Sequence, residues 1–367
     1  MKIGVLTSSR ADYGIYLPLL NKIKKDIFFD LEIIAFGTHL SENHGFTLNE
    51  IKKDEYTTIH EIKSLVEDDS QKGIVVSYGN TIVEFSNFWG KNYFDLVICL
   101  GDRFEMSAAV QASIPFGIKL AHISGGETTL GAIDNVYRHQ ITLASQLHFV
   151  STLEYKKKVE ELTGASENIH DVGALSLDNI SDFEPIEKLS FLETFHIKNE
   201  DYALVTFHPE TVAVNSNITF AKQMTAALAE LTKMLNIVIT MPNADTLGSV
   251  YRKQIYQLKK THPGKIVLVE NFGKVNYFSA MHYSKLLIGN TSSGIIEAAS
   301  FLKYVINVGS RQKGRAKSSN VFDVSFDAKN IVDKTKAILK LPNCTSDNVY
   351  YKTATAVTII KMIKQYD

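Results

Sequence analysis

The feature that most constrains this fold is a regular alternation of short apolar runs with longer segments of helical periodicity. The apolar runs are rich in Val, Ile and Leu and recur in both halves of the chain. A strand buried on both faces has such a sequence, and strands that alternate with helices form parallel sheets. We therefore predict an α/β fold, with strands that include Ile3–Thr7, Asp95–Leu100, Lys119–Ile123, Tyr202–Phe207 and Lys285–Ile288.

The length of the chain predicts two domains. A chain of 367 residues exceeds one domain of ordinary size. Polar residues and Pro185 interrupt the pattern near Asp178–Lys198, so we predict an N-terminal domain over residues 1–180 and a C-terminal domain over residues 181–349. A last helix, Thr353–Gln365 within residues 350–367, is expected to pack back on the N-terminal domain.

Charge and cysteine content exclude several classes of protein. Lys and Arg number 39 against 40 Asp and Glu, so a general surface for nucleic acid or anionic membrane is not expected. Cys99 and Cys344 supply neither a disulfide framework nor a zinc set, and Cys99 lies in an apolar run typical of a core. No segment resembles a signal peptide or a membrane span, so we predict a cytoplasmic protein. We also expect no metal site.

Candidate site residues follow the predicted strands, because open α/β sheets bind ligands beyond the carboxyl ends of their strands. Arg10 lies in the first such loop and can bind phosphate through its fork of donors, although a solvated arginine in a turn is the alternative. Asp102 and Arg103 follow Asp95–Leu100, where Asp102 could instead cap a helix. The first loop lacks G-x-G-x-x-G, so no nicotinamide or flavin cofactor is expected.

A third loop contributes more acidic residues. A Gly-Gly turn after Lys119–Ile123 presents Glu127, and Asp134, Arg138 and His139 lie on the next predicted helix. Asp134 and Arg138 are four residues apart and could form an ion pair. Several carboxylates at one edge of a sheet are nevertheless typical of general acid and base catalysis, and a solvated acidic rim is the weaker explanation.

The second half carries a histidine and a group of hydroxyl side chains. His208 follows Tyr202–Phe207 and can stabilise a departing phosphate, although a lone histidine is more often a packing or capping residue. Asn243 can supply amide hydrogen bonds. Hydroxyls and backbone N–H groups at a helix start bind phosphate, and Thr291, Ser292 and Ser293 precede Glu297 in such a position, with Arg311 in a later cationic loop.

Taken together, these motifs resemble those of the hydrolysing UDP-N-acetylglucosamine 2-epimerases of bacterial sialic acid pathways. The resemblance extends from Ser8 to at least Arg315 and rests on Gly101-Asp102-Arg103, Gly125-Gly126-Glu127, Ile133-Asp134, Arg138-His139, His208-Pro209-Glu210-Thr211, Gly289-Asn290-Thr291-Ser292-Ser293-Gly294 and Gly309-Ser310-Arg311-Gln312. It implies two Rossmann-like domains, as in GT-B glycosyltransferases, with the active site in the interdomain cleft and the UDP-binding domain second. It also implies cleavage of UDP-GlcNAc to UDP and N-acetylmannosamine without metal or redox cofactor, in a homodimer or homotetramer.

The resemblance also implies roles for individual residues. The matching catalytic positions are Asp102, Glu127, Asp134 and His208. The matching substrate-binding positions are Arg10, Arg103, Arg138, His139, Asn243, Asn271, Phe272, Thr291, Ser292, Ser293, Glu297 and Arg311, with Asn271 and Phe272 near the uracil.

Several related activities fit the same motifs. A non-hydrolysing epimerase would return a UDP-sugar, a GT-B glycosyltransferase would need an acceptor, and a sensor would only bind the UDP-sugar. Relatives that act on UDP-2,4-diacetamido-2,4,6-trideoxyglucose, in legionaminic acid synthesis, share closely similar motifs. The segment Thr128–Gly131 departs from the sialic acid pathway pattern and keeps this second substrate as an alternative.

Overall fold

The computed structural model describes residues 1–68, 70–242 and 248–366, and it divides into two compact units. Unit 1 comprises Met1–Glu127, Asp134–Asn179 and Tyr350–Asp367, and unit 2 comprises Thr128–Ile133 and Ile180–Val349. The boundary after Asn179 lies one residue before the predicted one. The assignment of Thr128–Ile133 to unit 2 was not expected from the sequence.

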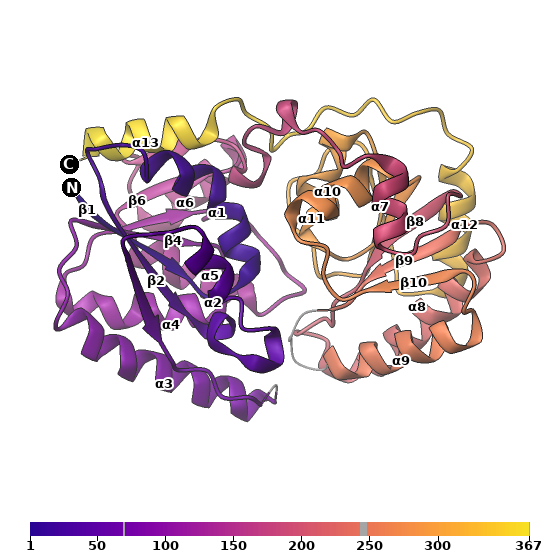
Figure 1. Ribbon diagram of the computed structural model, residues 1–367, viewed down its shortest axis with the longest axis horizontal. Helices are drawn as coiled ribbons and strands as arrows, with labels where there is room; N and C mark the ends of the chain where they lie inside the picture. The colour runs from indigo at the N-terminus through magenta and orange to yellow at the C-terminus, as the bar shows by residue number, and fades with distance from the viewer. Residues whose placement is uncertain (69, 243–247, 367) are drawn as a thin grey trace. The chain divides into compact units, whose positions relative to one another are not determined.

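Unit 1 is built on a parallel sheet of seven strands (Figure 1). Its spatial order is β3 (Thr58–Ile62), β2 (Asp30–Phe36), β1 (Lys2–Thr7), β4 (Leu96–Leu100), β5 (Leu120–Ile123), β6 (Leu147–Val150) and β7 (Ile169–Asp171). Alternate side chains of the central strands point to opposite faces, where they enter two separate apolar clusters. Cys99 is buried in one of them, as predicted for a small core residue.

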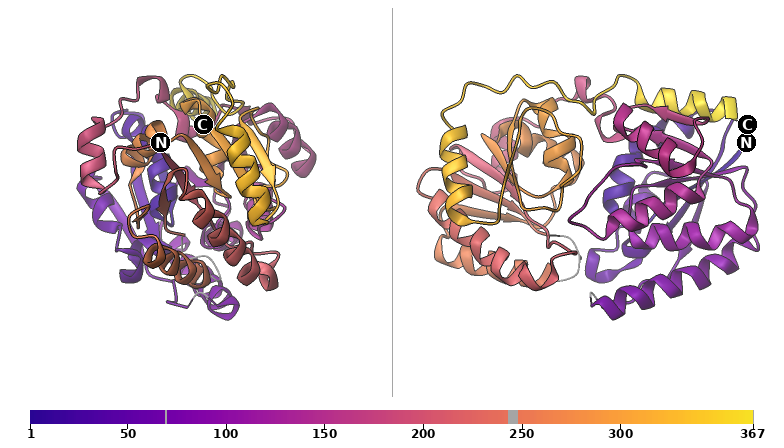
Figure 2. Two further views of the ribbon diagram at one scale, coloured as in Figure 1. Left: turned by 90° about the vertical axis from the view of Figure 1, so that its right-hand side faces the viewer. Right: turned by 180° about the vertical axis from the view of Figure 1, so that it is seen from behind.

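Helices cover both faces of this sheet (Figures 1 and 2). One face packs on α1 (Arg10–Ile23), α2 (Leu48–Lys53) and α13 (Thr355–Tyr366), and the other on α3 (Gln71–Trp89), α4 (Phe104–Ser113) and α5 (Asp134–Ala144). α6 (Leu153–Thr163) packs beside β6 and β7. The C-terminal helix α13 lies against α1, and Lys364 forms an ion pair of 2.6 Å with Asp26.

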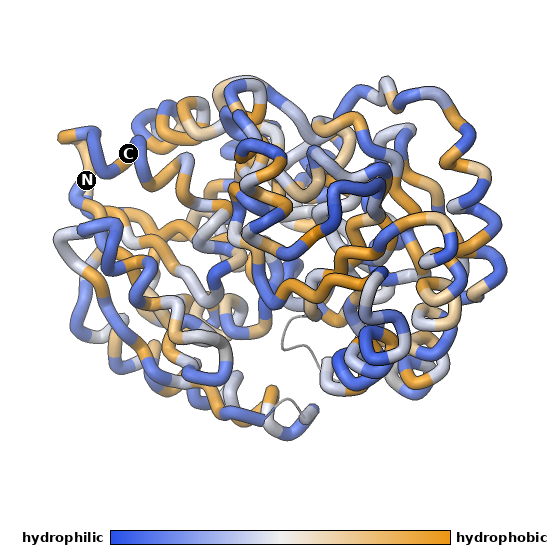
Figure 3. Tube along the Cα trace, turned by 45° about the vertical axis from the view of Figure 1, so that its right-hand side comes forward, coloured by the Kyte–Doolittle hydropathy of each residue, from blue (hydrophilic) through white to orange (hydrophobic). Residues whose placement is uncertain are grey.

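Unit 2 is built on a second parallel sheet, of six strands. Its order is β10 (Ile266–Val269), β9 (Asn236–Thr240), β8 (Tyr202–Thr206), β11 (Leu286–Gly289), β12 (Tyr304–Val308) and β13 (Val321–Val324). One face packs on α8 (Asn217–Leu231), α9 (Gly248–Thr261) and α12 (Ala328–Ile338), and the other on α7 (Lys188–Thr194) and α10 (Lys274–Tyr283). The short helix α11 (Ser292–Ile296) follows β11. Hydrophobic and hydrophilic stretches alternate along the chain in both units (Figure 3).

The predicted fold class is therefore confirmed, and the differences concern short elements. β13 was missed because it is a partly exposed edge strand whose sequence includes Asp323, so it lacks a continuous apolar run. The helices α2 and α7 were also missed, because a helix of one or two turns shows little periodicity. The expected helix Ile295–Phe301 is divided into α11 and a 3₁₀ turn over Ala298–Phe301.

Each sheet has one point where the direction of strand addition reverses. In unit 1 this point lies between β1 and β4, and in unit 2 it lies between β8 and β11. The loops that leave adjacent strands there diverge to opposite faces, which opens room for a ligand at the carboxyl edge. Arg10 and Asp102 follow β1 and β4, and His208 and Thr291 follow β8 and β11. Among the described residues, no helix combines the length and apolarity needed to cross a membrane.

Candidate active site

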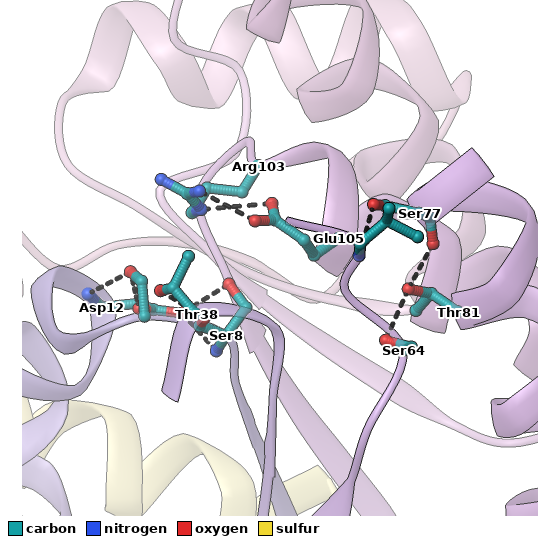
Figure 4. Close-up of polar contacts among 10 residues, drawn as sticks. Ser8, Asp12, Thr38, Ser64, Ser77, Thr81, Arg103 and Glu105 are labelled. Carbon is teal, nitrogen blue, oxygen red and sulfur yellow. Dashed lines mark hydrogen bonds and ion pairs between the residues drawn. The ribbon is translucent and has the colours of Figure 1, made fainter. Parts of the chain in front are cut away.

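The loop after β1 is held in place by a buried carboxylate, that of Asp12. Asp12 accepts hydrogen bonds from the backbone N–H of Ser8 at 2.7 Å, from the Ser8 hydroxyl at 3.0 Å and from the Ser9 hydroxyl. The carbonyl oxygen of Ser8 in turn accepts from the N–H and the hydroxyl of Thr38 (Figure 4). This network fixes the start of α1, whose first residue is Arg10. Asp12 was not among the site residues predicted from the sequence.

The loop after β4 carries Asp102 and Arg103 at the same edge of the sheet. Arg103 forms two hydrogen bonds with Glu105, from Nε at 3.2 Å and from Nη2 at 2.8 Å (Figure 4). Glu105 is only 1% exposed, whereas a quarter of the Arg103 side chain reaches solvent. A paired contact of this kind fixes the plane of the guanidinium. Glu105 was not among the predicted site residues.

Arg138 connects two of the three predicted catalytic acids. It is 1% exposed, and its Nη1 donates to the carbonyl oxygen of Glu127 at 2.8 Å while its Nη2 donates to the carboxylate of Asp102. The Glu127 carboxylate is itself buried and accepts from the Ser151 hydroxyl at 3.1 Å. Arg138, which was predicted to bind substrate, thus lies between the Asp102 carboxylate and the backbone of Glu127.

Two histidines lie near Arg138. His122 is buried, and its Nε2 lies 2.9 Å from the carbonyl oxygen of Gly101, next to Asp102. Burial lowers the pKa of His122 to about 3, so this side chain is neutral at physiological pH. His139 on α5 is half-buried, and burial together with the charges of Arg138 and Lys158 lowers its pKa. Asp134 is the first residue of α5 and is partly exposed.

In unit 2 the segment from His208 to Thr211 is hydrogen-bonded to several other segments. The backbone of His208 is hydrogen-bonded to the Asn290 side chain, and the buried Glu210 accepts from the Ser310 hydroxyl at 2.7 Å. The Thr211 hydroxyl accepts from the backbone N–H of Ile133 at 2.9 Å. The carboxyl end of β8 therefore contacts the loops that carry Thr291 and Arg311.

The predicted phosphate cradle follows β11. Thr291 is the N-cap of α11 and accepts from the N–H of Ser293 at 3.4 Å, while Ser292 is exposed. Glu297 is buried at the other end of this short helix. Gly289, with φ of 150°, has no room for a side chain, because a Cβ atom would overlap the carbonyl group of Thr206 on β8. The backbone of β11 thereby approaches β8 closely.

The remaining predicted residues have different surroundings. The ring of Phe272 is buried and packs on Phe191 and Phe195, at centroid distances of 6.0 and 4.6 Å. A base that meets this segment would therefore contact the backbone or Asn271, whose Oδ1 accepts from the N–H of Gly273. Arg311 is partly exposed in the loop after β12. Asn243 lies outside the described residues.

The segment Thr128–Ile133 docks on the rest of unit 2. The N–H of Leu130 donates to the carbonyl oxygen of Lys313 at 2.9 Å, in the loop that carries Arg311. Gly131 lies directly on the backbone of that loop, because a Cβ atom there would overlap the Ser310 carbonyl group and lie 2.6 Å from the Arg311 nitrogen. Only glycine fits such a close approach of two backbones.

Comparisons with known proteins agree with this architecture. A family model described as UDP-N-acetylglucosamine 2-epimerase matches residues 21–364. The chain is 34% identical to a GDP/UDP-N,N'-diacetylbacillosamine 2-epimerase (hydrolyzing) of Campylobacter jejuni, over 88% of this chain and 84% of that protein. It is 32% identical to a UDP-N,N'-diacetylbacillosamine 2-epimerase (hydrolyzing) of Legionella pneumophila, over 99% and 95% of the two chains. It is also 29% identical to the polysialic acid biosynthesis protein P7 of Escherichia coli, over 100% and 94%.

One solved structure has the same fold as this chain over the whole length of both. A UDP-GlcNAc 2-epimerase from Neisseria meningitidis, bound to UDP-GlcNAc, superposes with a TM-score of 0.82 and covers 100% of both chains at 18% identity. At that identity the likeness establishes the fold alone.

Proposed function

The chain belongs to the UDP-N-acetylglucosamine 2-epimerase family, and from that premise we propose that it hydrolyses a UDP-2-acetamido sugar with inversion at C2. The observation that carries the proposal is that the buried Arg138 bonds both the Asp102 carboxylate and the backbone carbonyl of Glu127 at the switch point of unit 1. Unit 1 would supply the acids and bases. Unit 2, with His208, Thr291 and Arg311, would bind UDP.

The chemistry of such a substrate explains the need for several acids. No carbonyl group acidifies the C2 proton of the sugar, so its direct removal is very hard. Departure of UDP with its bonding electron pair gives C1 oxocarbenium character, and a base can then remove the C2 proton to leave a 2-acetamidoglucal. Water adds to C1, and a proton returns to C2 from the opposite face. We propose that Asp102, Glu127 and Asp134 carry out the proton transfers and activate the water.

Cationic groups lower the barrier to the departure of UDP. Negative charge develops on the leaving phosphate, and donors placed beside it stabilise the transition state. We assign this task to His208 and Arg103. The proposed mechanism involves neither a metal nor a redox cofactor.

Replacement of the acids by amides tests this function. Asp102→Asn, Glu127→Gln and Asp134→Asn should each slow the release of UDP by roughly 10²-fold or more while UDP binding, measured by calorimetry, is retained. Asp95→Asn is the matched control, because Asp95 caps the amino end of the same sheet by accepting from the N–H of Lys2. Full activity in all three amides would refute the assignment.

The assay of UDP release also identifies the substrate. We propose UDP-GlcNAc as the substrate. Two relatives, at 34% and 32% identity, are named for UDP-N,N'-diacetylbacillosamine, which supports that compound as the second candidate. Turnover of both compounds side by side decides between them. Proton NMR of the product distinguishes a free sugar, expected from hydrolysis, from the UDP-sugar that a non-hydrolysing epimerase returns. Turnover without an acceptor argues against a glycosyltransferase.

A further inference from the structure

We propose that Asn290 is a positioning residue that fixes the backbone of His208 at the switch point of the unit 2 sheet. This inference rests on the proposed function, in which His208 stabilises the leaving phosphate. Asn290 follows β11 and His208 follows β8, so the contact joins the two strands between which the direction of strand addition reverses.

The Asn290 side chain forms two hydrogen bonds with one residue. Its Oδ1 accepts from the N–H of His208 at 2.7 Å, and its Nδ2 donates to the carbonyl oxygen of His208 at 2.8 Å. A peptide N–H can only donate and a peptide carbonyl can only accept, so the orientation of the amide is determined. Asn290 is fully buried, which shields both bonds from water.

The backbone of Asn290 extends this contact to a third segment. Its N–H donates to the carbonyl oxygen of Thr206 at 3.1 Å, and its own carbonyl oxygen accepts from Nε2 of Gln312 at 2.8 Å. Gln312 is buried and follows Arg311 in the loop after β12. Asn290 thus holds the histidine through its side chain and the loop of Arg311 through its backbone.

Because the contacts are divided in this way, an effect on His208 can be separated from an effect on the loop of Arg311. A substitution at position 290 removes the side-chain bonds to His208 but keeps the backbone carbonyl that anchors Gln312. An aspartate has the same shape but cannot donate to the His208 carbonyl, and its charge would face that oxygen. An alanine removes both bonds without adding a buried charge.

The test measures UDP release and UDP binding in Asn290→Asp and Asn290→Ala. We expect kcat to fall roughly 10- to 100-fold, because a small displacement of a catalytic group is enough for such a loss, while the affinity for UDP falls by less than kcat does. Asn320→Asp is the matched control. Asn320 is also fully buried in unit 2, but it donates to the carbonyl oxygen of Lys303 at 2.7 Å, before β12 begins. It should lower the unfolding midpoint without lowering kcat.

A double-mutant cycle with His208→Ala shows whether Asn290 acts through the histidine. Single-turnover assays with excess enzyme keep the slow variants measurable. If Asn290 only positions His208, Asn290→Ala should cause no further loss in the His208→Ala background. Additive losses, or a kcat loss no greater than that of Asn320→Asp, would overturn the positioning role and leave the proposed function intact. Full activity of His208→Ala would instead overturn the role proposed for the histidine, and this inference with it.

Discussion

The Nη2 atom of Arg138 donates a hydrogen bond to Oδ2 of Asp102, and this pair ties α5 to the loop after β4. The guanidinium also holds the carbonyl oxygen of Glu127. One buried side chain therefore sets the positions of two proposed catalytic acids that lie 25 residues apart in the sequence, from position 102 to position 127. Its removal should disturb both acids at once.

Arg138→Met retains the length and the apolar stem of the side chain but removes every donor. We expect roughly 3 kcal/mol of destabilisation, because Asp102 and the Glu127 carbonyl lose a buried partner, and a fall of about 10²-fold in UDP release. Urea unfolding and the release assay measure the two effects. Arg138→Lys, which keeps the charge but not the two-pronged geometry, should also lose most of its activity. A methionine variant with normal turnover would contradict the positioning role.

Glu105→Gln should weaken UDP binding by about tenfold, since an amide offers one acceptor where the carboxylate offers two to Arg103. Calorimetry with UDP measures the change. In an Arg103→Ala background the same substitution should have no further effect on binding. Glu230→Gln is the control, because Glu230 pairs with Lys233 on the exposed surface of unit 2. An equal loss of affinity in that control would show that the effect is not specific to Arg103.

Gly131→Ala places a methyl group against the backbone of Ser310 and Arg311. The loop must shift to accept it, at a cost of about 1–3 kcal/mol, and because Arg311 moves with the loop, UDP binding should weaken as well. A lower unfolding midpoint and a higher Kd for UDP are the expected results. The neighbouring Leu130→Ala should change neither, since the Leu130 side chain is exposed and its backbone bond remains. Unchanged UDP binding in Gly131→Ala would contradict the coupling to Arg311.

Acid should destabilise the fold through two buried histidines. Burial lowers the pKa of His122 to about 3 and that of His148 to about 4. Between these values and the ordinary pKa of about 6.5, the unfolded chain binds protons that the folded chain does not. Stability should therefore fall as the pH drops below about 6.5, by up to about 1.4 kcal/mol per pH unit for each group.

Urea unfolding at a series of pH values from neutral to pH 4 measures this slope. His148→Asn should reduce the slope, because one of the two groups no longer titrates. An identical slope in that variant would show that other groups account for the loss of stability in acid.

The strands and the loops that carry the candidate site residues could largely be predicted from the sequence alone. Continuous apolar runs such as Leu96–Leu100 predict strands buried on both faces, because only a sheet covered by helices can bury such a run. The order of the strands was not predicted. The loops after the strands could still be located, because Gly, Asp, Arg and hydroxyl residues gather where the apolar runs end. The acids Asp102 and Glu127 and the cradle at Thr291 were proposed in this way.

The tertiary structure decided how these residues are held. Arg138, a predicted substrate-binding residue, is buried against Asp102 and the backbone of Glu127, and Asn290, which was given no role of its own, is bonded to His208. Hydrogen bonds between segments far apart in the chain leave no periodicity or spacing in the sequence. They depend on which strands become neighbours, and that order is set by the packing of both sheets as a whole. The sequence therefore determined which chemical groups are present, and the packing determined which of them are held against one another.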